Sequence, residues 1–564
     1  MSSTAAQKWP PPANRLLKHA HSPWLYSAGL LALGAIHALA FAPGPLPSWT
    51  LPFVDIFTLA VLAKVVFQSS SVLRAAGAGL LLGLANFSVG VYWLYISMHS
   101  FGGLAAPLAA GAVLILAFVL ALFITLASAL ARWLSARHLG LPANYRWHLL
   151  IAAVWASCWT ATEWLRGTLF TGFPWLNIGY AHVEGVLAGW APVVGVYGLA
   201  WLSAFAAGAV ALLAGAKDNQ NDAAAAITVG AAIVTGLVGI LLGHIGWSQP
   251  HGEPMVIRLV QGNVPQTEKF DPSRMLQGIE SYMRLAALAP KEPDGAPSLI
   301  VLPETVMPVF QDRIAPQIWE QWLHIAKERN ATILMGIPLH RNLNGQDQYT
   351  NSAIGFNAST SLSQLGAATL PMAYDKHHLV PFGEFIPWGF RWFVHAMQIP
   401  LGDFNRGAPR QRLFQINGQA FSPDICYEDV FGEEIIRSVR DSEVYGPGAN
   451  ILVNVSNLAW FGNSWALRQH LQISRMRALE TARPMIRATN TGMTAAIAPD
   501  GRVRAALDPL HKGVLDVEVQ GATGLTPYVR WGNWPVLAWT GLFLLWGWAL
   551  RKRVPGGQQG DDTP

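Results

Sequence analysis

One cysteine of this chain, Cys426, follows an apolar run and precedes two acidic residues in the stretch DICYEDVF. A thiolate can attack an acyl carbon, but a free thiol is largely protonated near neutral pH, so a nucleophilic cysteine needs a base. Two other residues also stand where strands are expected to end: Glu304 after LIVLP and Lys376 in AYDKHHLVPFGEFIP. A carboxylate can take the thiol proton, and a fixed ammonium can stabilise an oxyanion. Together these residue types would support nucleophilic catalysis by a cysteine thiolate.

Each of the three residues also has a simpler structural interpretation. A lone cysteine on a strand is more often an inert packed side chain than a nucleophile. The glutamate could cap a local turn, and the lysine could be a solvated surface charge. Their spacing along the chain follows no geometric rule, so the residue types alone leave both interpretations open.

The elements that must hold these residues lie between Glu253 and Arg530, where charges return and Pro and Gly separate short β-rich runs. Strands that alternate with amphipathic helices, many of them fully apolar, are typical of an α/β sheet covered by helices. Side chains at the ends of such strands are held by the sheet and open to a cleft. The expected strands cover 255–264, 298–305, 332–340, 349–356, 421–430, 449–457 and 493–501, and the expected helices cover 272–289, 315–329 and 464–482.

The rest of the chain has the composition of a membrane protein. Charged residues make up 13% of the 564 residues, about half the roughly 25% typical of soluble proteins. The run from Ala75 to Ala131 has no Asp, Glu, Lys or Arg and is longer than the roughly 20 residues that cross a bilayer. Membrane helices are expected near 26–44, 50–68, 72–97, 105–133, 148–165, 187–215, 224–247 and 533–550.

These features divide the chain into three parts. Residues 1–252 are expected to form a membrane domain of about seven helices, 253–530 an extracytoplasmic catalytic domain, and 531–564 a final membrane helix with a basic cytoplasmic tail. Basic residues flank the apolar segments, as the positive-inside pattern requires, with Arg166 as a lone exception. The flanking residues are Arg15, Lys18, Arg132, Arg137, Arg146, Arg551, Lys552 and Arg553.

Two features of the membrane part remain open. The first apolar segment could be a cleaved signal peptide, because Ala38, Leu39 and Ala40 resemble a small-residue cleavage site; the catalytic domain would still lie outside. The segment 167–182, GTLFTGFPWLNIGYAH, is too interrupted for a simple span. It is either an interfacial loop with an aromatic belt or part of a path by which lipid reaches the catalytic domain.

Several other functions are not indicated. The basic residues form no stripe with aromatics, so nucleic-acid binding is not expected. The adjacent His377 and His378 cannot both bind one metal from a strand, and no zinc-type spacing occurs, so no metal or other cofactor is expected. Cys158, the other cysteine, lies in an apolar segment that is expected to be a membrane helix, so no disulfide framework is expected.

At the three strand ends the chain resembles the nitrilase superfamily, which uses a Glu–Lys–Cys set on a layered αββα sandwich. The stretches LPE, KHHLVPFGEFIP, ICYE, VNVSNLAWFG, QHLQISRMRALETARP and TGLTPYVRWGNWP, with the membrane segments, resemble more narrowly the bacterial apolipoprotein N-acyltransferase family. The implied fold is a polytopic α-helical membrane protein with an inserted α/β nitrilase-like αββα sandwich domain. Leu302 and Leu458 depart from the family pattern, which often has Trp and Asp there.

The resemblance implies that Glu304 is the general base, Lys376 the oxyanion stabiliser and Cys426 the acylated nucleophile. Glu428 and Asp429 are expected to organise the turn after the nucleophile. Trp460 and Phe461 either cover an acyl pocket or merely pack, and we favour the pocket. The expected supporting and substrate-binding residues are Glu384, Tyr427, Glu428, Trp460 and Phe461.

The implied partners are a phospholipid acyl donor, a diacylglyceryl-modified apolipoprotein acceptor and the membrane. We expect a monomer in the bacterial inner membrane, with its catalytic domain in the periplasm and ping-pong kinetics through a thioester. One alternative is a membrane-tethered nitrilase-type amidase, which would have a narrow, water-lined pocket. Another is a transporter, but the long uncharged helices do not favour the polar or broken spans that transporters use.

Overall fold

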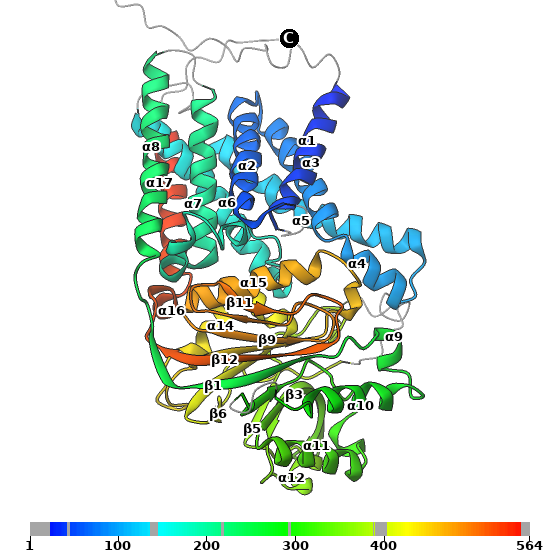
Figure 1. Ribbon diagram of the computed structural model, residues 1–564. Coiled ribbons are helices and arrows are strands. Elements are labelled where there is room, and N and C mark those ends of the chain that lie inside the picture. The colour runs from blue at the N-terminus through cyan, green and yellow to red at the C-terminus, as the bar shows by residue number, and fades with distance from the viewer. Residues whose placement is uncertain are drawn as a thin grey trace, which may run out of the picture.

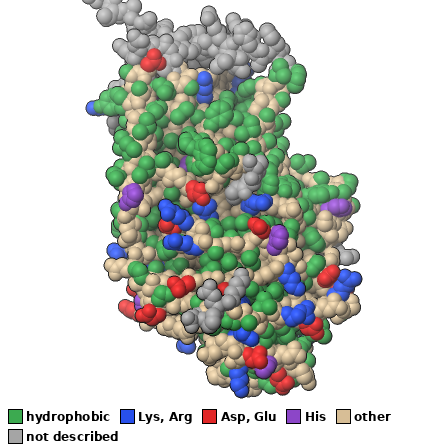
Figure 2. All heavy atoms as spheres, viewed as in Figure 1, with side chains coloured by type: hydrophobic (Ala, Val, Ile, Leu, Met, Phe, Trp, Pro, Cys, Tyr) green, Lys and Arg blue, Asp and Glu red, His purple; other side chains and the backbone are tan. Residues whose placement is uncertain are grey.

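The computed structural model describes residues 23–41, 46–135, 145–215, 219–290, 295–386, 389 and 403–553. Three of the basic residues used to predict the topology, Arg15, Lys18 and Arg137, lie outside these ranges. The long helices gather at one end of the molecule, the strands lie at the other end together with shorter helices, and the final helix returns to the end of the long helices (Figure 1). Hydrophobic side chains dominate the helical end, whereas charged side chains concentrate toward the other (Figure 2).

Helices form at each of the predicted membrane segments. Among the described residues, six helical segments are long and apolar enough to cross a membrane, so the chain is a multi-pass membrane protein. These segments correspond to α1 (Pro23–His37), α2 (Leu51–Gln68), α3 (Val72–Gly90), α5 (Ala106–Ser135), α7 (Ala191–Leu213) and α8 (Asn219–Leu242). Two further helices, α6 (Tyr145–Thr168) and α17 (Trp534–Arg553), pack among them (Figure 1).

Arg166, the exception to the charge pattern, lies buried near the end of α6. Its guanidinium donates hydrogen bonds to the carbonyl oxygens of Phe173 and Trp175, both at 2.6 Å. The same group lies 3.4 Å from Oε1 of Glu163, which is also buried. Both side chains are therefore internal, and Arg166 anchors the segment 167–182.

The strands form two six-stranded sheets, with the orders β12-β1-β2-β3-β4-β5 and β11-β10-β9-β8-β7-β6. Each predicted strand is present, although the segment predicted as 421–430 leaves the sheet at Ile425. The first sheet contains β1 (Gln249–Gln261), β2 (Leu299–Val301), β3 (Thr332–Leu343), β4 (Gln346–Phe356), β5 (Met372–Asp375) and β12 (Gly513–Thr523). The second contains β6 (Phe414–Ile416), β7 (Gln419–Ile425), β8 (Ile451–Ser456), β9 (Met485–Thr489), β10 (Ala495–Ile497) and β11 (Val503–Ala506).

The two sheets pack face to face through one apolar core, to which Leu259 and Val301 contribute from one sheet and Ile425 and Val453 from the other. Helices α10 (Met275–Ala286) and α11 (Pro316–Arg329) cover the outer face of the first sheet. Helices α14 (Gly432–Val439) and α15 (Ala466–Thr481) cover the second. Strands that are apolar on both sides need such cover, and the predicted αββα sandwich is confirmed.

Helix α15 lies between the second sheet and the membrane helices (Figure 1). Its Ile473, Met476 and Leu479 belong to the apolar core of the membrane helices. The side-chain oxygen of Gln469 accepts hydrogen bonds from the indole N–H groups of Trp93 at 3.1 Å and of Trp175 at 2.8 Å. Helix α15 therefore packs between the two domains.

Candidate active site

The candidate nucleophile stands at a sharp change in backbone direction. Strand β7 ends at Ile425, and Cys426 begins a 3-10 turn that runs to Val430. The φ angle of Cys426 is +54°, a left-handed value that is uncommon for a residue with a side chain and that often marks a functional site. This turn ends the predicted strand early, because a left-handed residue cannot continue the sheet.

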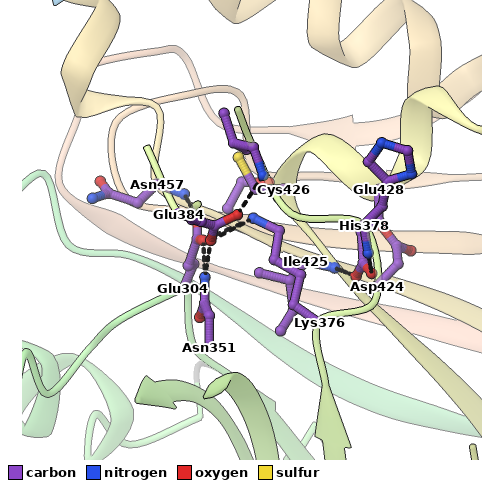
Figure 3. Close-up of polar contacts among 12 residues, drawn as sticks. Glu304, Asn351, Lys376, His378, Glu384, Asp424, Ile425, Cys426, Glu428 and Asn457 are labelled. Atoms are coloured by element: carbon purple, nitrogen blue, oxygen red, sulfur yellow. Dashed lines mark hydrogen bonds and ion pairs between the residues drawn. The ribbon is translucent and has the colours of Figure 1, made fainter. Parts of the chain in front are cut away.

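Glu304 and Lys376 come from the first sheet. Glu304 follows β2 and is buried, and Lys376 follows β5 with its side chain only 1% exposed. The Lys376 Nζ atom lies 2.9 Å from Oε1 of Glu384 and 3.6 Å from Oε1 of Glu304. Figure 3 shows the lysine and the two carboxylates pointing toward one another, close to the sulfur of Cys426. The structure thus brings the three predicted residues together with Glu384, one of the predicted supporting residues (Figure 3).

Asn351 of β4 joins the two carboxylates. Its Nδ2 atom lies 2.8 Å from Oε1 of Glu304 and 2.6 Å from Oε1 of Glu384. The other oxygen of Glu304 accepts from the backbone N–H of Asn457 at 2.9 Å. Glu304 is therefore held by an amide, a backbone N–H and a nearby ammonium, which fix the direction of the candidate base.

The surroundings shift the pKa values of the lysine and the thiol. Burial lowers the pKa of Lys376, but the carboxylates of Glu384 and Glu304 outweigh it, so its pKa is raised and the ammonium is retained. Burial, helped by the charge of Glu304, raises the pKa of the Cys426 thiol well above its usual range, despite the opposing charge of Lys376. A thiol in this state needs a base to become a nucleophile.

A second buried lysine, Lys269, lies against the candidate base. It ends the short helix α9 (Gln266–Lys269), and its Nζ atom donates to the carbonyl oxygen of Glu304 at 3.0 Å. Burial lowers the pKa of Lys269 to about 7, although Glu304 and Cys426 raise it. Sequence reasoning missed Lys269 and Asn351, since no spacing marks them. Asn457 stands at the end of the predicted strand 449–457, and this position was the one sequence signal that it could belong to the site.

Glu428 joins the two sheets behind the site. One of its oxygens accepts from the backbone N–H groups of His377 at 2.7 Å and His378 at 3.0 Å, directly after Lys376. Its other oxygen accepts from the backbone N–H of Ile425 at 2.7 Å. Burial raises the pKa of Glu428 to about 7, against the lowering effects of Lys376 and the backbone donors. The carboxyl group thus ties the Lys376 loop to the end of β7.

Tyr427, next to the nucleophile, faces the membrane helices. Its hydroxyl donates to the carbonyl oxygen of Gly172 at 3.2 Å. Its ring stacks on Trp175, with ring centroids 6.4 Å apart and an interplanar angle of 11°. The segment 167–182 therefore contacts the residue beside Cys426. Its role as a lipid path or an interfacial loop stays a prediction.

Trp460 and Phe461 also lie where the two domains meet. The Trp460 ring lies 6.2 Å from that of Phe101 and 6.4 Å from that of Phe270, and the Phe461 ring lies 4.5 Å from that of Trp93. These contacts form an aromatic cluster beside the site, and whether it covers an acyl chain stays a prediction.

The two departures from the family pattern, Leu302 and Leu458, are both fully buried. Leu302 belongs to the apolar core beneath α10 and α11, so the position that often holds Trp is filled by apolar packing here. In the part of the chain that the structure describes, no group of three or more His, Cys, Asp or Glu side chains is suited to hold a metal ion.

Comparisons with known proteins match both halves of the chain. The family model "Apolipoprotein N-acyltransferase N-terminal domain" matches residues 33–209, and the model "Carbon-nitrogen hydrolase" matches residues 256–528. The second match agrees with the predicted nitrilase-like domain. Among solved structures, an amidase of the nitrilase superfamily from Nesterenkonia aligns with a TM-score of 0.34 and 17% identity, over 50% of this chain and 95% of that one.

Curated relatives match almost the whole chain. An apolipoprotein N-acyltransferase of Bordetella bronchiseptica is 53% identical over 94% of this chain and 98% of its own length. Another, of Ralstonia nicotianae, is 44% identical over 94% of both chains. The similarity therefore spans the membrane helices and the sandwich together.

Proposed function

Because the chain belongs to the apolipoprotein N-acyltransferase family, we propose that Cys426 carries the acyl group as a thioester between the donor and the acceptor. The family membership itself means that the enzyme transfers an acyl group to an apolipoprotein. The proposal adds the reacting atoms, the nature of the two substrates and the side of the membrane. The observation that carries it is the convergence of a partly buried thiol, a carboxylate and an ammonium at the ends of β7, β2 and β5.

In the first half-reaction, Glu304 takes the proton from the Cys426 thiol, and the thiolate attacks the carbonyl carbon of a phospholipid acyl ester. Lys376 stabilises the oxyanion of the tetrahedral intermediate, a contribution of a few kcal/mol in a buried site. The intermediate then expels the glycerol oxygen, which takes the proton back from Glu304. The products are a thioester on Cys426 and a lysophospholipid.

In the second half-reaction, the acceptor is the α-amine of a diacylglyceryl-modified cysteine at the N-terminus of an apolipoprotein. Such an amine has an ordinary pKa of about 7.7–8.0 and is partly neutral near pH 7. The amine attacks the thioester carbon, Glu304 removes a proton from the nitrogen, and the Cys426 thiolate leaves and is reprotonated. The result is an amide, and the two steps predict ping-pong kinetics.

The supporting residues have roles in the same scheme. Glu384 and Asn351 hold Lys376 and Glu304 at a fixed separation, which their contacts of 2.6–2.9 Å support. Glu428 holds the Lys376 loop against the end of β7. Tyr427 shapes the side of the site that faces the membrane helices, where a lipid acyl chain would arrive.

The two-part architecture suits substrates that lie in a membrane. We place residues 253–530 in the periplasm of a bacterial inner membrane, held by the helices of 1–252 and 531–564 at the level of the outer leaflet. Arg132, Arg146 and Arg551 on the opposite end support this orientation. A reporter that works only in the cytoplasm, fused after Gly252, should be silent, and a bright signal would overturn the topology.

The thioester is tested by incubating the purified full chain with phospholipid and measuring its intact mass. Wild type should gain one acyl group, which hydroxylamine removes and which disappears when an acceptor with a free α-amine is added. Cys426→Ala should gain none, and Cys426→Ser should be nearly as inactive, because a hydroxyl is a far weaker nucleophile. Cys158→Ala is the matched control, since this other cysteine is buried in α6 and should leave the adduct unchanged. An adduct that persisted in Cys426→Ala would contradict the proposal.

A further inference from the structure

A buried histidine outside the catalytic set contacts the backbone of the nucleophile. His470 of α15 is fully buried, and its Nε2 atom lies 3.1 Å from the carbonyl oxygen of Cys426 and 2.8 Å from Oδ1 of Asp429. Its other ring nitrogen, Nδ1, lies 2.9 Å from the guanidinium of Arg487. A guanidinium only donates, so Nδ1 must accept. Nε2 therefore carries the hydrogen that it shares between Cys426 and Asp429.

The histidine belongs to a closed ring of four buried side chains. The second oxygen of Asp429 accepts a hydrogen bond from the hydroxyl of Ser474, and that hydroxyl oxygen accepts from Arg487 at 2.6 Å. Asp429 lies in the turn after Cys426, His470 and Ser474 lie on α15, and Arg487 lies on β9. All four side chains are fully buried. In such a ring each member fixes the direction of the next.

The carbonyl group that His470 contacts belongs to Cys426, and its direction is set by the backbone conformation of the candidate nucleophile. A residue with a left-handed φ, such as the +54° of Cys426, persists only where the surrounding structure holds it. The Cys426 carbonyl oxygen also accepts from Nδ2 of Asn454 at 3.2 Å. A carbonyl oxygen has two acceptor sites, and both are occupied, so the peptide plane after Cys426 is fixed.

We propose that His470 is a positioning residue that holds Cys426 in its left-handed conformation through the Nε2–H hydrogen bond. Asp429, Ser474 and Arg487 hold the imidazole in the required tautomer. The fixed backbone aims the sulfur at Glu304 and Lys376. This inference rests on the proposed function of Cys426 as the nucleophile.

A simpler role for His470 would be packing, and two variants separate the roles. The His470 ring stacks on Trp175, with centroids 5.8 Å apart and an interplanar angle of 19°. His470→Phe keeps an aromatic ring against Trp175 but removes the N–H donor. His470→Gln removes the ring but keeps one N–H donor and one acceptor. Positioning therefore predicts that Gln retains more reactivity than Phe, and packing predicts the opposite order.

The experiment measures how fast iodoacetamide alkylates Cys426 in the full chain, by peptide mass, together with kcat and KM for acyl-adduct formation. Losing one hydrogen bond should slow both reactions by about tenfold in His470→Phe, with KM for phospholipid unchanged. His470→Gln should stay within about threefold of wild type. A Phe variant that equals or exceeds the Gln variant would overturn the proposal.

His324→Gln is the matched control, because His324 lies on α11 with its side chain 68% exposed, and its rates should equal those of wild type. If neither His470 variant can be obtained as folded protein, Ser474→Ala provides the test instead. Removing the Ser474 hydroxyl takes a hydrogen bond from Asp429 with little change in side-chain volume. It should slow alkylation by about three- to tenfold, and an unchanged rate would overturn the proposal. A wild type that forms no acyl adduct contradicts the proposed function instead, while the order of the alkylation rates still tests the positioning.

Discussion

Replacing Lys376 with Met should separate the contribution of this lysine to stability from its contribution to catalysis. Its ammonium lies 2.9 Å from Glu384 and 3.6 Å from Glu304, and both carboxylates are buried. Without it, the two carboxylates face each other across the amide of Asn351, and each keeps one backbone N–H donor, from Val380 and Asn457 respectively. Removing one partner of a buried ion pair costs about 3–5 kcal/mol of unfolding free energy. For a domain of this size, that corresponds to a fall in Tm on the order of 10 °C.

The loss of catalysis has a different origin, and its cost in activation free energy should be similar to the cost in unfolding free energy. Removing one group that stabilises an oxyanion costs about 2.7–4 kcal/mol, or roughly 10²–10³ in rate. Lys376→Met should therefore form the acyl adduct about 10²–10³ times more slowly than wild type. The double variant Lys376→Met with Glu384→Gln removes one negative charge together with the positive one. Its stability should recover by about half or more, whereas its rate should not recover.

Thermal unfolding followed by circular dichroism in detergent, and intact mass against time with phospholipid, measure the two quantities on the same samples. The Glu384→Gln single variant is the control, because it keeps the ammonium and one carboxylate. The electrostatic account of the site fails if the double variant is as unstable as Lys376→Met. The oxyanion role fails if Lys376→Met keeps a rate within tenfold of wild type.

Three further predictions concern single residues. Lys376→Arg should keep the charge and lose about 10²-fold in adduct formation, because a planar guanidinium cannot place its donors where a compact ammonium does; near-normal turnover would assign the oxyanion to another group. Glu304→Gln should slow adduct formation by roughly 10²–10⁴-fold, since an amide cannot take the thiol proton, and a rate above a tenth of wild type would exclude it as the base. The pKa of Lys269 is lowered to about 7 in the folded protein. At pH values between about 7 and the ordinary pKa of a lysine, the unfolded chain therefore binds more protons than the folded one. The unfolding free energy of wild type should rise with pH in this range, by up to about 1.4 kcal/mol per pH unit relative to Lys269→Met. Parallel plots of unfolding free energy for the two proteins between pH 7 and 9 would contradict that sign.

Glu304 could be placed because it follows the fully apolar strand β2, and Cys426 because it lies in the predicted strand 421–430. The ends of covered strands are where side chains meet. The strand before Lys376, β5, was not among the expected strands, because its four residues are only partly buried and show no clear pattern. Strand β12 was missed although its Leu515, Val517 and Val519 alternate with Asp516 and Glu518, a period that predicts a half-buried strand. Strand β6 has only three residues and is too short to show a period.

The polar partners of the site could not be predicted, since they depend on contacts between distant segments. His470 lies on a helix whose several basic residues suggest a solvated face, and Arg487 lies on a short strand. Both are buried beside Asp429, which accepts a hydrogen bond from Nε2 of His470 and whose charge stabilises the guanidinium of Arg487. Lys269 is likewise placed by tertiary structure, against a carbonyl group that the sequence does not distinguish from any other.

Helix α15 has a consequence for anyone who wishes to make a water-soluble enzyme from this chain. A fragment cut at 253 and 530 would present Ile473, Met476 and Leu479 to solvent, and the Gln469 oxygen would lose both of its indole donors. Exposed apolar area of this kind costs about 25 cal/mol per Å² and promotes aggregation. Polar replacements on that face are therefore the first redesign needed. In the intact protein the shared helix links the two halves, and heating should melt them in one transition.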